Sequence, residues 1–348
     1  MKSRAAILVE QKKPLVIEDV EVPAPKLGQV LVRVLASGIC GSQIGEIDGG
    51  KGPDKFLPHL LGHEGCGEVL EVGEGVRTVK PGDRVVHHWR KGAGLESVTP
   101  VYESRIGRVN AGWVTTFNEY AVVSENRLTA IPSDFDPEVA ALFGCAVTTG
   151  FGVVTNNARL AIGESIAVFG AGGIGLNIVQ GAALAGGNPI IALDRFDNRL
   201  ALARSLGATH AINVTKADAA EEIKKIVGND GVDVAVDNTG NVEVIALASR
   251  LTNARGRTVL VGVPPKDSTA AISTLPLHFE KQLVGSHGGE CRPDVDIPHY
   301  VRMVREGRLS LAPLIGHRYP LADINDAIAD MKSGRLAGRA IVHVSRSS

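Results

Sequence analysis

Three segments far apart in the sequence contain residues that can bind a transition metal. They are Gly38-Ile39-Cys40-Gly41-Ser42, Gly62-His63-Glu64-Gly65 and Phe143-Gly144-Cys145-Ala146. Thiolate and neutral imidazole are preferred ligands of Zn²⁺, and a catalytic zinc site uses three protein ligands and leaves a fourth position open. Spacing alone leaves a simpler interpretation, because a lone buried cysteine is usually a core residue and a lone histidine is usually structural or solvated.

A second group of residues can bind a dinucleotide. Residues 170–175 read GAGGIG, a GxGxxG pattern formed by Gly170, Gly172 and Gly175 between an apolar segment and a helical one. The first glycine permits a tight turn, the second lets a pyrophosphate approach the backbone, and the third lets helix and strand pack closely. We therefore expect a nicotinamide cofactor to place its pyrophosphate on this loop, which includes Gly173 and Ile174, at a helix N-terminus.

An acid follows the glycine loop at a distance that fits the same cofactor. Asp194 lies nineteen residues beyond Gly175, at the end of the next expected strand, where a carboxylate receives the adenosine ribose hydroxyls. A carboxylate there repels a 2′-phosphate, so it favours NAD over NADP. Arg195 and Arg199 leave NADP as an alternative, because arginines can bind that phosphate. The simpler interpretation is a packing turn followed by an aspartate that caps a helix.

The elements that must position these residues fall into two parts that meet near residue 147. Before it, short β-rich runs such as QVLVRVLASG and NEYAVVS lie between Gly/Pro turns, which predicts an all-β or barrel-like domain. After it, apolar strands alternate with helical segments, which predicts a parallel sheet covered on both faces, a doubly wound α/β domain. The stretch from roughly residue 289 is mixed, with two helical segments and a closing strand, RAIVHVS.

Length and composition agree with two globular domains. The 348 residues are 44% hydrophobic, and 37 basic residues nearly balance 38 acidic ones, which argues against nucleic-acid or membrane-surface partners. No apolar run reaches the roughly 18 residues of a membrane span, and no signal peptide is visible, so we expect a soluble cytoplasmic protein. The four cysteines are widely spaced without a CxxC, which favours metal ligands or buried small residues over disulfides.

Taken together, the motifs resemble the zinc-dependent alcohol and polyol dehydrogenase branch of the medium-chain dehydrogenase/reductase family. The segments GICGS, LGHEGCGEV, VKPGDRVV, FGCAVTTGFG, VFGAGGIGL, ALDRFDNRLALARSLGA and VDNTG occur in that family's order over essentially the whole chain. The resemblance implies a GroES-like catalytic domain over residues 1–148, completed by 289–348, and a Rossmann NAD-binding domain over 149–288. It also implies a homodimer or homotetramer, for which residues 282–288 could supply an edge strand or could equally be buried within the chain.

The resemblance also assigns roles around the metal by position. It implies that Cys40, His63 and Cys145 hold a catalytic zinc ion and that Ser42 relays the proton of the substrate. Glu64 matches an acid that in this family is either a neighbour of the ligand histidine or an exchanging zinc ligand.

Two further positions are implied for the cofactor. Thr149 begins the cofactor domain and is expected near the nicotinamide. Arg339 falls where the family places a basic residue near the pyrophosphate, although a merely solvated arginine is the alternative.

The sequence departs from the family pattern in the segment that follows GDRVV. Many relatives have four closely spaced cysteines there that hold a structural zinc, whereas residues 87–118 contain none. We therefore expect a long loop without a metal and one zinc ion per subunit, the catalytic one. His87, His88 and Trp89 either line the substrate cleft or pack this segment.

Two positions of the outer shell also differ. Gln43 stands where an aspartate usually hydrogen-bonds the ligand histidine; a glutamine can orient the ring but supplies no charge. Gly45 stands where relatives often have a histidine that passes the proton to solvent. Water, Glu46 or a histidine of residues 87–118 would have to complete that route.

The function that these residues favour is hydride transfer between NAD and an alcohol bound to zinc. The resemblance favours a polyol, cyclitol or sugar-derived secondary alcohol as substrate, because Gly41 stands where some simple alcohol dehydrogenases have a basic residue and the CGS form with GHEG is common in polyol and sugar dehydrogenases. Residues 87–118, with two histidines and several arginines, would also suit a hydroxyl-rich or charged substrate. A simple primary or secondary alcohol is the alternative. The remaining rivals are a zinc-free reductase of the same fold and a non-catalytic NAD-binding protein.

Overall fold

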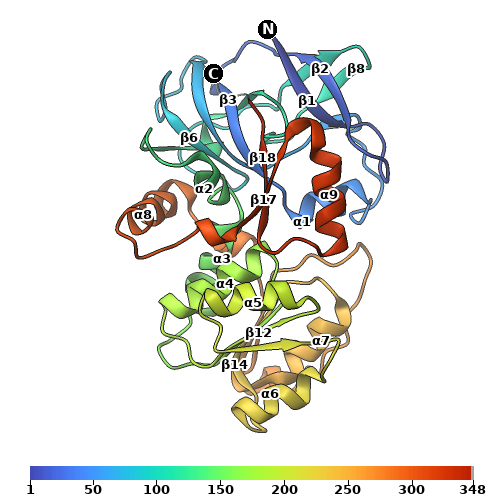
Figure 1. Cartoon of the computed structure of the whole chain (residues 1–348), viewed down its shortest axis with the longest axis vertical. Coiled ribbons are helices and arrows are strands. Elements are labelled where there is room, and N and C mark those ends of the chain that lie inside the picture. Colours follow the sequence, from blue (N-terminus) through green and yellow to red (C-terminus); the bar gives the residue numbers. More distant parts are fainter. Residues whose placement is uncertain (346–348) are drawn as a thin grey trace. The chain divides into compact units, whose positions relative to one another are not determined.

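The computed structural model describes residues 1–345 as two compact units (Figure 1). Unit 1 consists of Met1–Cys145 together with the chain from Arg292 onward, and unit 2 is Ala146–Cys291. The divisions lie three residues from the expected ones at residues 148 and 288. Each unit has its own hydrophobic core, because the buried side chains cluster separately within it.

A closed barrel of five short strands forms one part of unit 1. Its order is β1 (Lys2–Leu8), β2 (Val16–Glu21), β7 (Val101–Ser104), β8 (Gly107–Asn110) and β4 (His59–Leu60). Strands β7 and β8 form a hairpin within residues 87–118, so the expectation that this segment is only a loop is wrong. The hairpin forms because it buries Tyr102 and Val109 in the barrel interior against Ala5 and Ile7.

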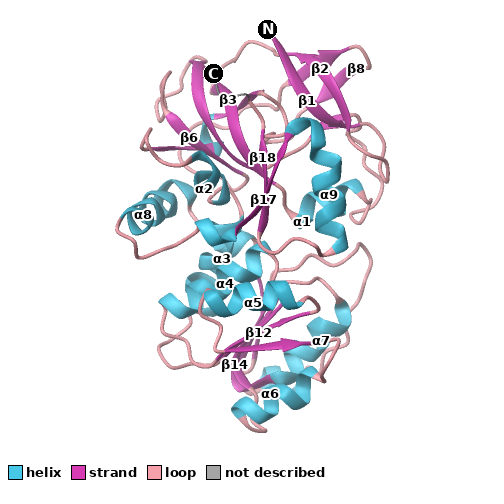
Figure 2. Cartoon of the chain, viewed as in Figure 1, coloured by secondary structure: helices cyan, strands magenta, loops and turns pink. Residues whose placement is uncertain are grey.

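A seven-stranded sheet forms the other part of unit 1 (Figure 2). Its order is β10 (Leu128–Ile131), β6 (Arg84–His88), β5 (Glu64–Val72), β3 (Gln29–Gly38), β18 (Arg339–His343) and β17 (Ile315–Pro320), and β9 (Tyr120–Ser124) also pairs with β3. Strand β18 pairs antiparallel with β3, with Ile341 opposite Gly38. The segment after unit 2 therefore completes a sheet begun near the N-terminus.

In the described part of unit 1, four α-helices accompany these sheets: α1 (Gly41–Ile47), α2 (Pro137–Leu142), α8 (Pro293–Arg305) and α9 (Ile324–Ser333). Helix α2 begins where the Asp136 carboxylate accepts the N–H of Glu138, with proline at the first helical position. The sequence patterns predicted α8 and α9 but neither α1 nor α2, which are one to two turns long and carry little periodicity.

Unit 2 is a parallel six-stranded sheet in the order β13-β12-β11-β14-β15-β16, which is the doubly wound dinucleotide-binding order. Its strands are β11 (Ile166–Phe169), β12 (Ile190–Asp194), β13 (His210–Asn213), β14 (Val232–Asp237), β15 (Thr252–Leu260) and β16 (Gln282–Gly285). Its helices are α3 (Ala146–Gly152), continued by a π-helical turn over Val153–Ala158, α4 (Gly173–Leu184), α5 (Asp197–Ser205), α6 (Ala219–Val227) and α7 (Val242–Leu251). The expected fold class is confirmed, because the continuous apolar strands are buried on both faces.

Strand β16 lies at one edge of this sheet and pairs only with β15 among the described residues. Within residues 1–345, none of the helices is both long enough and apolar enough to cross a membrane.

Candidate metal centre and cofactor loop

Three side chains of unit 1 converge although they are far apart in sequence. Cys40, His63 and Cys145 each bring one possible ligand atom to within 4.8 Å of the other two. Cys40 caps the start of α1 where β3 has ended, His63 directly precedes β5, and Cys145 follows α2. Strands β3 and β5 are paired along their length, so the sheet fixes the first two ligands next to each other.

The donor atoms of this cluster fit a tetrahedral zinc ion. The two sulfur atoms lie 4.0 Å apart, and two thiolates on one tetrahedral zinc lie about 3.8 Å apart, as Zn–S bonds of roughly 2.3 Å require. The Nε2 atom of His63 is buried and has no hydrogen-bond partner in the described part of the chain. A buried imidazole nitrogen without a partner is unfavourable unless a ligand satisfies it.

The charges around the two thiols favour the form that binds metal. A hydrogen bond from Cys145 holds the pKa of Cys40 well below its ordinary range, and the Arg339 guanidinium contributes in the same direction. The same hydrogen bond raises the pKa of Cys145. The pair therefore shares one negative charge, and a divalent cation would allow both thiols to ionise.

Glu64 and Arg339 form a buried ion pair beside the cluster. The Nε of Arg339 lies 2.7 Å from Oε1 of Glu64, and the two side chains are 4% and 0% exposed. Burial raises the pKa of the Glu64 carboxyl, whereas the charge of Arg339 opposes this rise. A Cβ on Gly38 would lie 2.5 Å from Oε1 of Glu64, so only glycine lets β3 pass this carboxylate.

The alternative interpretation of Arg339 as a solvated side chain is therefore wrong, because the side chain is buried. Its Nη2 atom has no hydrogen-bond partner within residues 1–345. The expected contact with the cofactor pyrophosphate stays a prediction.

Gln43 acts on the cysteine rather than on the histidine. Its Oε1 accepts the backbone N–H of Cys40 at 2.9 Å, and its buried Nε2 has no partner among the described residues. The interpretation that it orients the His63 ring is therefore not supported by any hydrogen bond of the structure. Gln43 closes the first turn of α1 and fixes the backbone of Cys40.

The expected proton relay begins on an exposed turn. Ser42 lies in the first turn of α1, and a side chain added at Gly45 would meet nothing within 4 Å. The open space at Gly45 leaves room for water. Glu46, the acid considered for this route, faces Lys51 and His59, with each ion-pair distance 3.9 Å.

The histidines of residues 87–118 are buried and do not line a cleft. His87 and His88 are both 0% exposed. His88 is fixed by Thr129 Oγ1 at 2.9 Å and the Arg90 carbonyl at 2.7 Å, while neither ring nitrogen of His87 has a partner in the described chain. Packing is therefore the correct interpretation for both, which removes them as candidates for passing the proton to solvent.

A single carboxylate anchors the segment that lacks cysteines. Glu125 is 1% exposed, and its two oxygens accept the backbone N–H groups of Arg77 at 2.6 Å, Thr78 at 2.7 Å and Leu95 at 2.7 Å. Burial alone would raise the pKa of Glu125, but these N–H groups hold it below its ordinary value. Nothing in the sequence around Glu125 indicates this role, because all three donors come from remote turns.

Arg127 extends that anchor to the two tryptophans of the chain. Its buried guanidinium pairs with Glu96 at 3.0 Å and donates to the Trp89 carbonyl. The same group lies 5.1 Å from the centre of the Trp113 ring, close enough for a cation–π contact.

The glycine loop of unit 2 has the geometry that its sequence predicts. Gly170 has φ of +95°, and a Cβ on Gly175 would lie 1.9 Å from the Gly170 carbonyl oxygen, so both positions require glycine. Helix α4 starts directly after Gly172. Free N–H groups at this N-terminus fit an anion such as a pyrophosphate.

Asp194 ends β12 and holds the glycine loop. Its carboxylate accepts the N–H of Ala171 at 2.8 Å and those of Arg195 and Phe196 at 2.7 and 3.1 Å. These bonds order the loop and the turn into α5. The expected contact with a ribose stays a prediction.

The two arginines after Asp194 stack on one aromatic ring. The guanidinium groups of Arg195 and Arg199 lie 5.5 and 4.8 Å from the centre of the Phe196 ring.

Elsewhere in unit 2, the Thr149 hydroxyl is buried without a partner among the described residues, which fits a ligand contact and leaves its expected role a prediction.

Comparison with known proteins places these features in context. Residues 26–133 match the family model described as the alcohol dehydrogenase GroES-like domain, and residues 173–306 match the zinc-binding dehydrogenase model. The chain is 34% identical over 372 aligned positions to an S-(hydroxymethyl)glutathione dehydrogenase of Synechocystis, covering 99% of this chain and 100% of that protein.

Two solved structures share the whole fold. Benzyl alcohol dehydrogenase from Acinetobacter calcoaceticus superposes with a TM-score of 0.89 at 27% identity over 99% of this chain and 100% of that one. A zinc-binding dehydrogenase from Sinorhizobium meliloti, solved with NADP bound, has a TM-score of 0.80 at 26% identity over 99% of each chain.

Proposed function

The chain belongs to the zinc-dependent medium-chain dehydrogenase/reductase family, and from this premise we propose that it oxidises an alcohol with NAD at one zinc ion per subunit. The observation that carries the proposal is the cluster of Cys40, His63 and Cys145, with its two sulfurs 4.0 Å apart and the unpartnered Nε2 of His63. A zinc-free reductase would have no need of these three residues, and a non-catalytic protein would have no need of an open metal position.

Zinc held by these three residues would make an alcohol oxygen acidic near neutral pH, and the nicotinamide would accept the hydride. The chain's own residues do the remaining work. Ser42, two residues after Cys40 on an exposed turn, accepts the proton of the alcohol and passes it to water in the space beside Gly45. Arg339, held in place by its ion pair with Glu64, lowers the pKa of Cys40 and so favours the thiolate that binds metal.

NAD is proposed as the cofactor because Asp194 ends β12 as an ionisable group next to the expected ribose position. Arg195 and Arg199 support the NADP alternative, as does the NADP-bound relative from Sinorhizobium meliloti. Comparing kcat/KM for the two cofactors tests this choice. An Asp194→Ala change should lower the preference for NAD.

The substrate proposal is a polyol, cyclitol or sugar-derived secondary alcohol, and it rests on Gly41 with the CGS and GHEG forms. The polar character of residues 87–118 supports it less than the sequence indicated, because His87 and His88 are buried and cannot bind hydroxyl groups of a substrate. One observation favours the alternative, a simple primary or secondary alcohol. Trp89 follows His88, which lies opposite Glu64 in the sheet, so its ring could pack against an apolar substrate.

A substrate screen that follows NADH absorbance tests both candidates. It should span polyols, cyclitols, amino sugars, benzyl alcohol and S-(hydroxymethyl)glutathione, the last two because relatives are named for them. A Trp89→Ala variant should raise KM for an aromatic alcohol and leave KM for a polyol unchanged. Absence of turnover with every alcohol, in protein that contains zinc, would overturn the proposed activity.

The homodimer or homotetramer and the cytoplasmic location stay predictions. The edge position of β16, which pairs only with β15 among residues 1–345, supports edge-to-edge joining of two sheets. Sedimentation of the protein measures the oligomeric state.

A further inference from the structure

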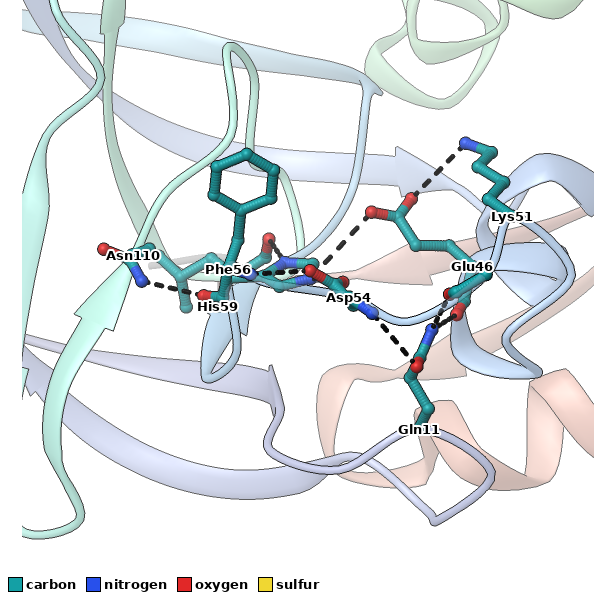
Figure 3. A network of polar contacts seen from close by, with 9 residues as sticks. Gln11, Glu46, Lys51, Asp54, Phe56, His59 and Asn110 are labelled. Carbon is teal, nitrogen blue, oxygen red and sulfur yellow. Dashed lines mark hydrogen bonds and ion pairs between the residues drawn. The ribbon is translucent and has the colours of Figure 1, made fainter.

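A second group of metal-binding side chains lies in unit 1, outside the cluster of Cys40, His63 and Cys145. Glu46 comes from the last turn of α1, Asp54 from the loop that follows, and His59 from β4. One possible ligand atom of each lies within 4.8 Å of the other two. Figure 3 shows the three side chains directed toward one another.

The imidazole of His59 is fixed so that one nitrogen faces the two acids. The residue is 6% exposed, and its Nδ1 lies 2.9 Å from the Leu60 carbonyl oxygen. A carbonyl only accepts, so Nδ1 carries the proton, and Nε2 points at Oδ2 of Asp54 at 2.7 Å. Contact with an ionised carboxylate requires a second proton on Nε2 or a metal ion in its place. Metal-binding histidines commonly donate their other N–H to a backbone carbonyl in this manner.

The two carboxylates have ligand oxygens to spare. Oδ1 of Asp54 accepts the Phe56 N–H at 2.8 Å, which leaves Oδ2 to the cluster. Burial would raise the pKa of Asp54, but the Phe56 N–H and the His59 ring lower it, so the carboxyl is ionised near neutral pH. The Glu46 carboxylate accepts no hydrogen bond within the described residues; its nearest cations, Nε2 of His59 and Nζ of Lys51, are each 3.9 Å away.

Gln11 clamps the segments that carry the two acids. Its Nε2 donates to the Gly52 carbonyl at 3.1 Å and the Glu46 carbonyl at 3.4 Å, while its Oε1 accepts the Asp54 N–H at 3.2 Å. Figure 3 shows this amide between the end of α1 and the following loop. The backbone of both acids is therefore held before any ion binds, which lowers the ordering cost of binding.

We propose that Glu46, Asp54 and His59 form a second, exchangeable site for a divalent cation such as Mn²⁺ or Zn²⁺, in which the ion replaces the Nε2 proton of His59. One imidazole and two carboxylates suit these ions, which bind nitrogen and oxygen at about 2.1 Å and complete their shell with water. The exposed ammonium of Lys51 competes for Glu46, so the ion is held more weakly than zinc at the two cysteines.

Titration of the zinc-loaded full chain with Mn²⁺, followed through the electron paramagnetic resonance signal of free Mn²⁺, tests the site. We expect one Mn²⁺ per chain with the zinc content unchanged. Asp54→Asn and His59→Gln should each weaken binding by at least roughly tenfold. Lys51→Gln removes the competing charge and should tighten binding by roughly threefold.

Two controls keep the test decisive. Glu222→Gln alters a half-buried acid paired with Lys225 in unit 2 and should leave Mn²⁺ binding unchanged. Lys51 is 58% exposed, so its replacement should not disturb folding even if replacement of the buried His59 does. The proposal is overturned if no Mn²⁺ binds at millimolar concentration, if His59→Gln leaves binding intact, or if Lys51→Gln does not strengthen it.

The ring protons of His59 provide a second readout. With Zn²⁺ as the probe, nitrogen-15 spectra of the imidazole should lose the Nε2 proton and keep the Nδ1 proton that Leu60 accepts. If both ring protons persist at saturating Zn²⁺, the site holds an imidazolium and not a metal.

Discussion

Two regions of unit 1 bury charged groups in opposite ways. Beside Cys40, the Nε2 of His63 and the Nη2 of Arg339 have no partner within residues 1–345. Around Glu125, by contrast, both carboxylate oxygens accept N–H groups from the chain itself. The difference distinguishes a site from a support: the His63 nitrogen is left for a metal ion and the Arg339 guanidinium for an acceptor, whereas the Glu125 carboxylate is satisfied by the chain itself.

This contrast also explains how the segment over residues 87–118 stays folded without cysteines. Glu125 ties two turns together, and Arg127 connects Glu96 with the Trp89 carbonyl. A buried carboxylate that accepts three N–H groups can therefore act as a cross-link in this segment.

The largest expected effect comes from removing one of the three candidate zinc ligands, Cys40, His63 and Cys145. Cys40→Ser should lower turnover by on the order of a thousandfold, because it removes zinc and with it the stabilisation of the alkoxide. Zinc content, measured by elemental analysis, should fall together with turnover, while NAD affinity stays near that of the wild type. Turnover that survives without zinc would contradict the zinc mechanism.

The same measurement tests the number of metal ions. We expect one zinc per chain after dialysis, because the segment anchored by Glu125 needs no metal and the proposed site at Glu46, Asp54 and His59 exchanges its ion. Two zinc ions retained by extensively washed protein would refute this part of the comparison.

Glu125→Gln should destabilise the segment that Glu125 anchors without changing the candidate zinc ligands. The amide keeps one acceptor oxygen but places an NH₂ group against backbone N–H donors, which should lower the free energy of unfolding by about 3 kcal/mol. Denaturant unfolding measures this loss, and zinc content should remain at the wild-type level. A variant that loses zinc to the same degree as Cys40→Ser would show that the two regions are coupled.

His87 fits neither region. Its ring nitrogens are buried without a hydrogen-bond partner among the described residues, and it belongs to neither cluster of possible metal ligands. Burial lowers the pKa of His87 to about 3. The unfolded chain, with a pKa near 6.5, then binds more protons than the folded one, so stability is complete above pH 6.5 and declines as the pH falls toward 3. Between pH 6.5 and 5 this group alone should account for a loss of about 2 kcal/mol.

A His87→Leu variant should therefore show a flatter dependence of unfolding free energy on pH. His88, whose pKa burial lowers to about 4, remains in both proteins and serves as the internal reference. Equal slopes for the variant and the wild type would mean that water or another group stabilises the His87 ring.

The smallest expected effect is that of breaking an exposed ion pair at the edge of the segment that Glu125 anchors. Lys91 pairs with Glu96, but the two side chains are 60% and 35% exposed. Lys91→Gln should change the unfolding free energy by less than about 0.5 kcal/mol, since exposed ion pairs contribute little. A loss as large as that of Glu125→Gln would place the anchor in Arg127 and Glu96 instead.

Sequence patterns predicted the parts of the molecule in which the cause is local. The glycine loop and the strand that ends at Asp194 follow from neighbouring residues, because strand period and turn chemistry act over a few positions. The hairpin of β7 and β8 was missed because its apolar residues pack against β1, a partner about a hundred positions away.

The candidate site could be predicted only in part for the same reason. Cys40, His63 and Cys145 stood out through resemblance, since no spacing rule joins residues so distant. The pairing of Arg339 with Glu64 and the clamping of Cys40 by Gln43 depend on side-chain geometry after folding. The Glu125 anchor left no sequence signal, because its donors are backbone groups that any residue provides.

The position of β18 has a consequence for the order in which the protein can be made. Unit 2 is continuous and can fold as soon as the ribosome has released it, whereas the sheet of unit 1 lacks β18 until synthesis passes Arg339. Arg339, which pairs with Glu64 beside the metal-binding cysteines, takes its place only with that strand. Because the Arg339 charge lowers the pKa of both Cys40 and the Glu64 carboxyl, these groups hold their protons more tightly until β18 is in place, and the finished chain should capture zinc more readily than the nascent one.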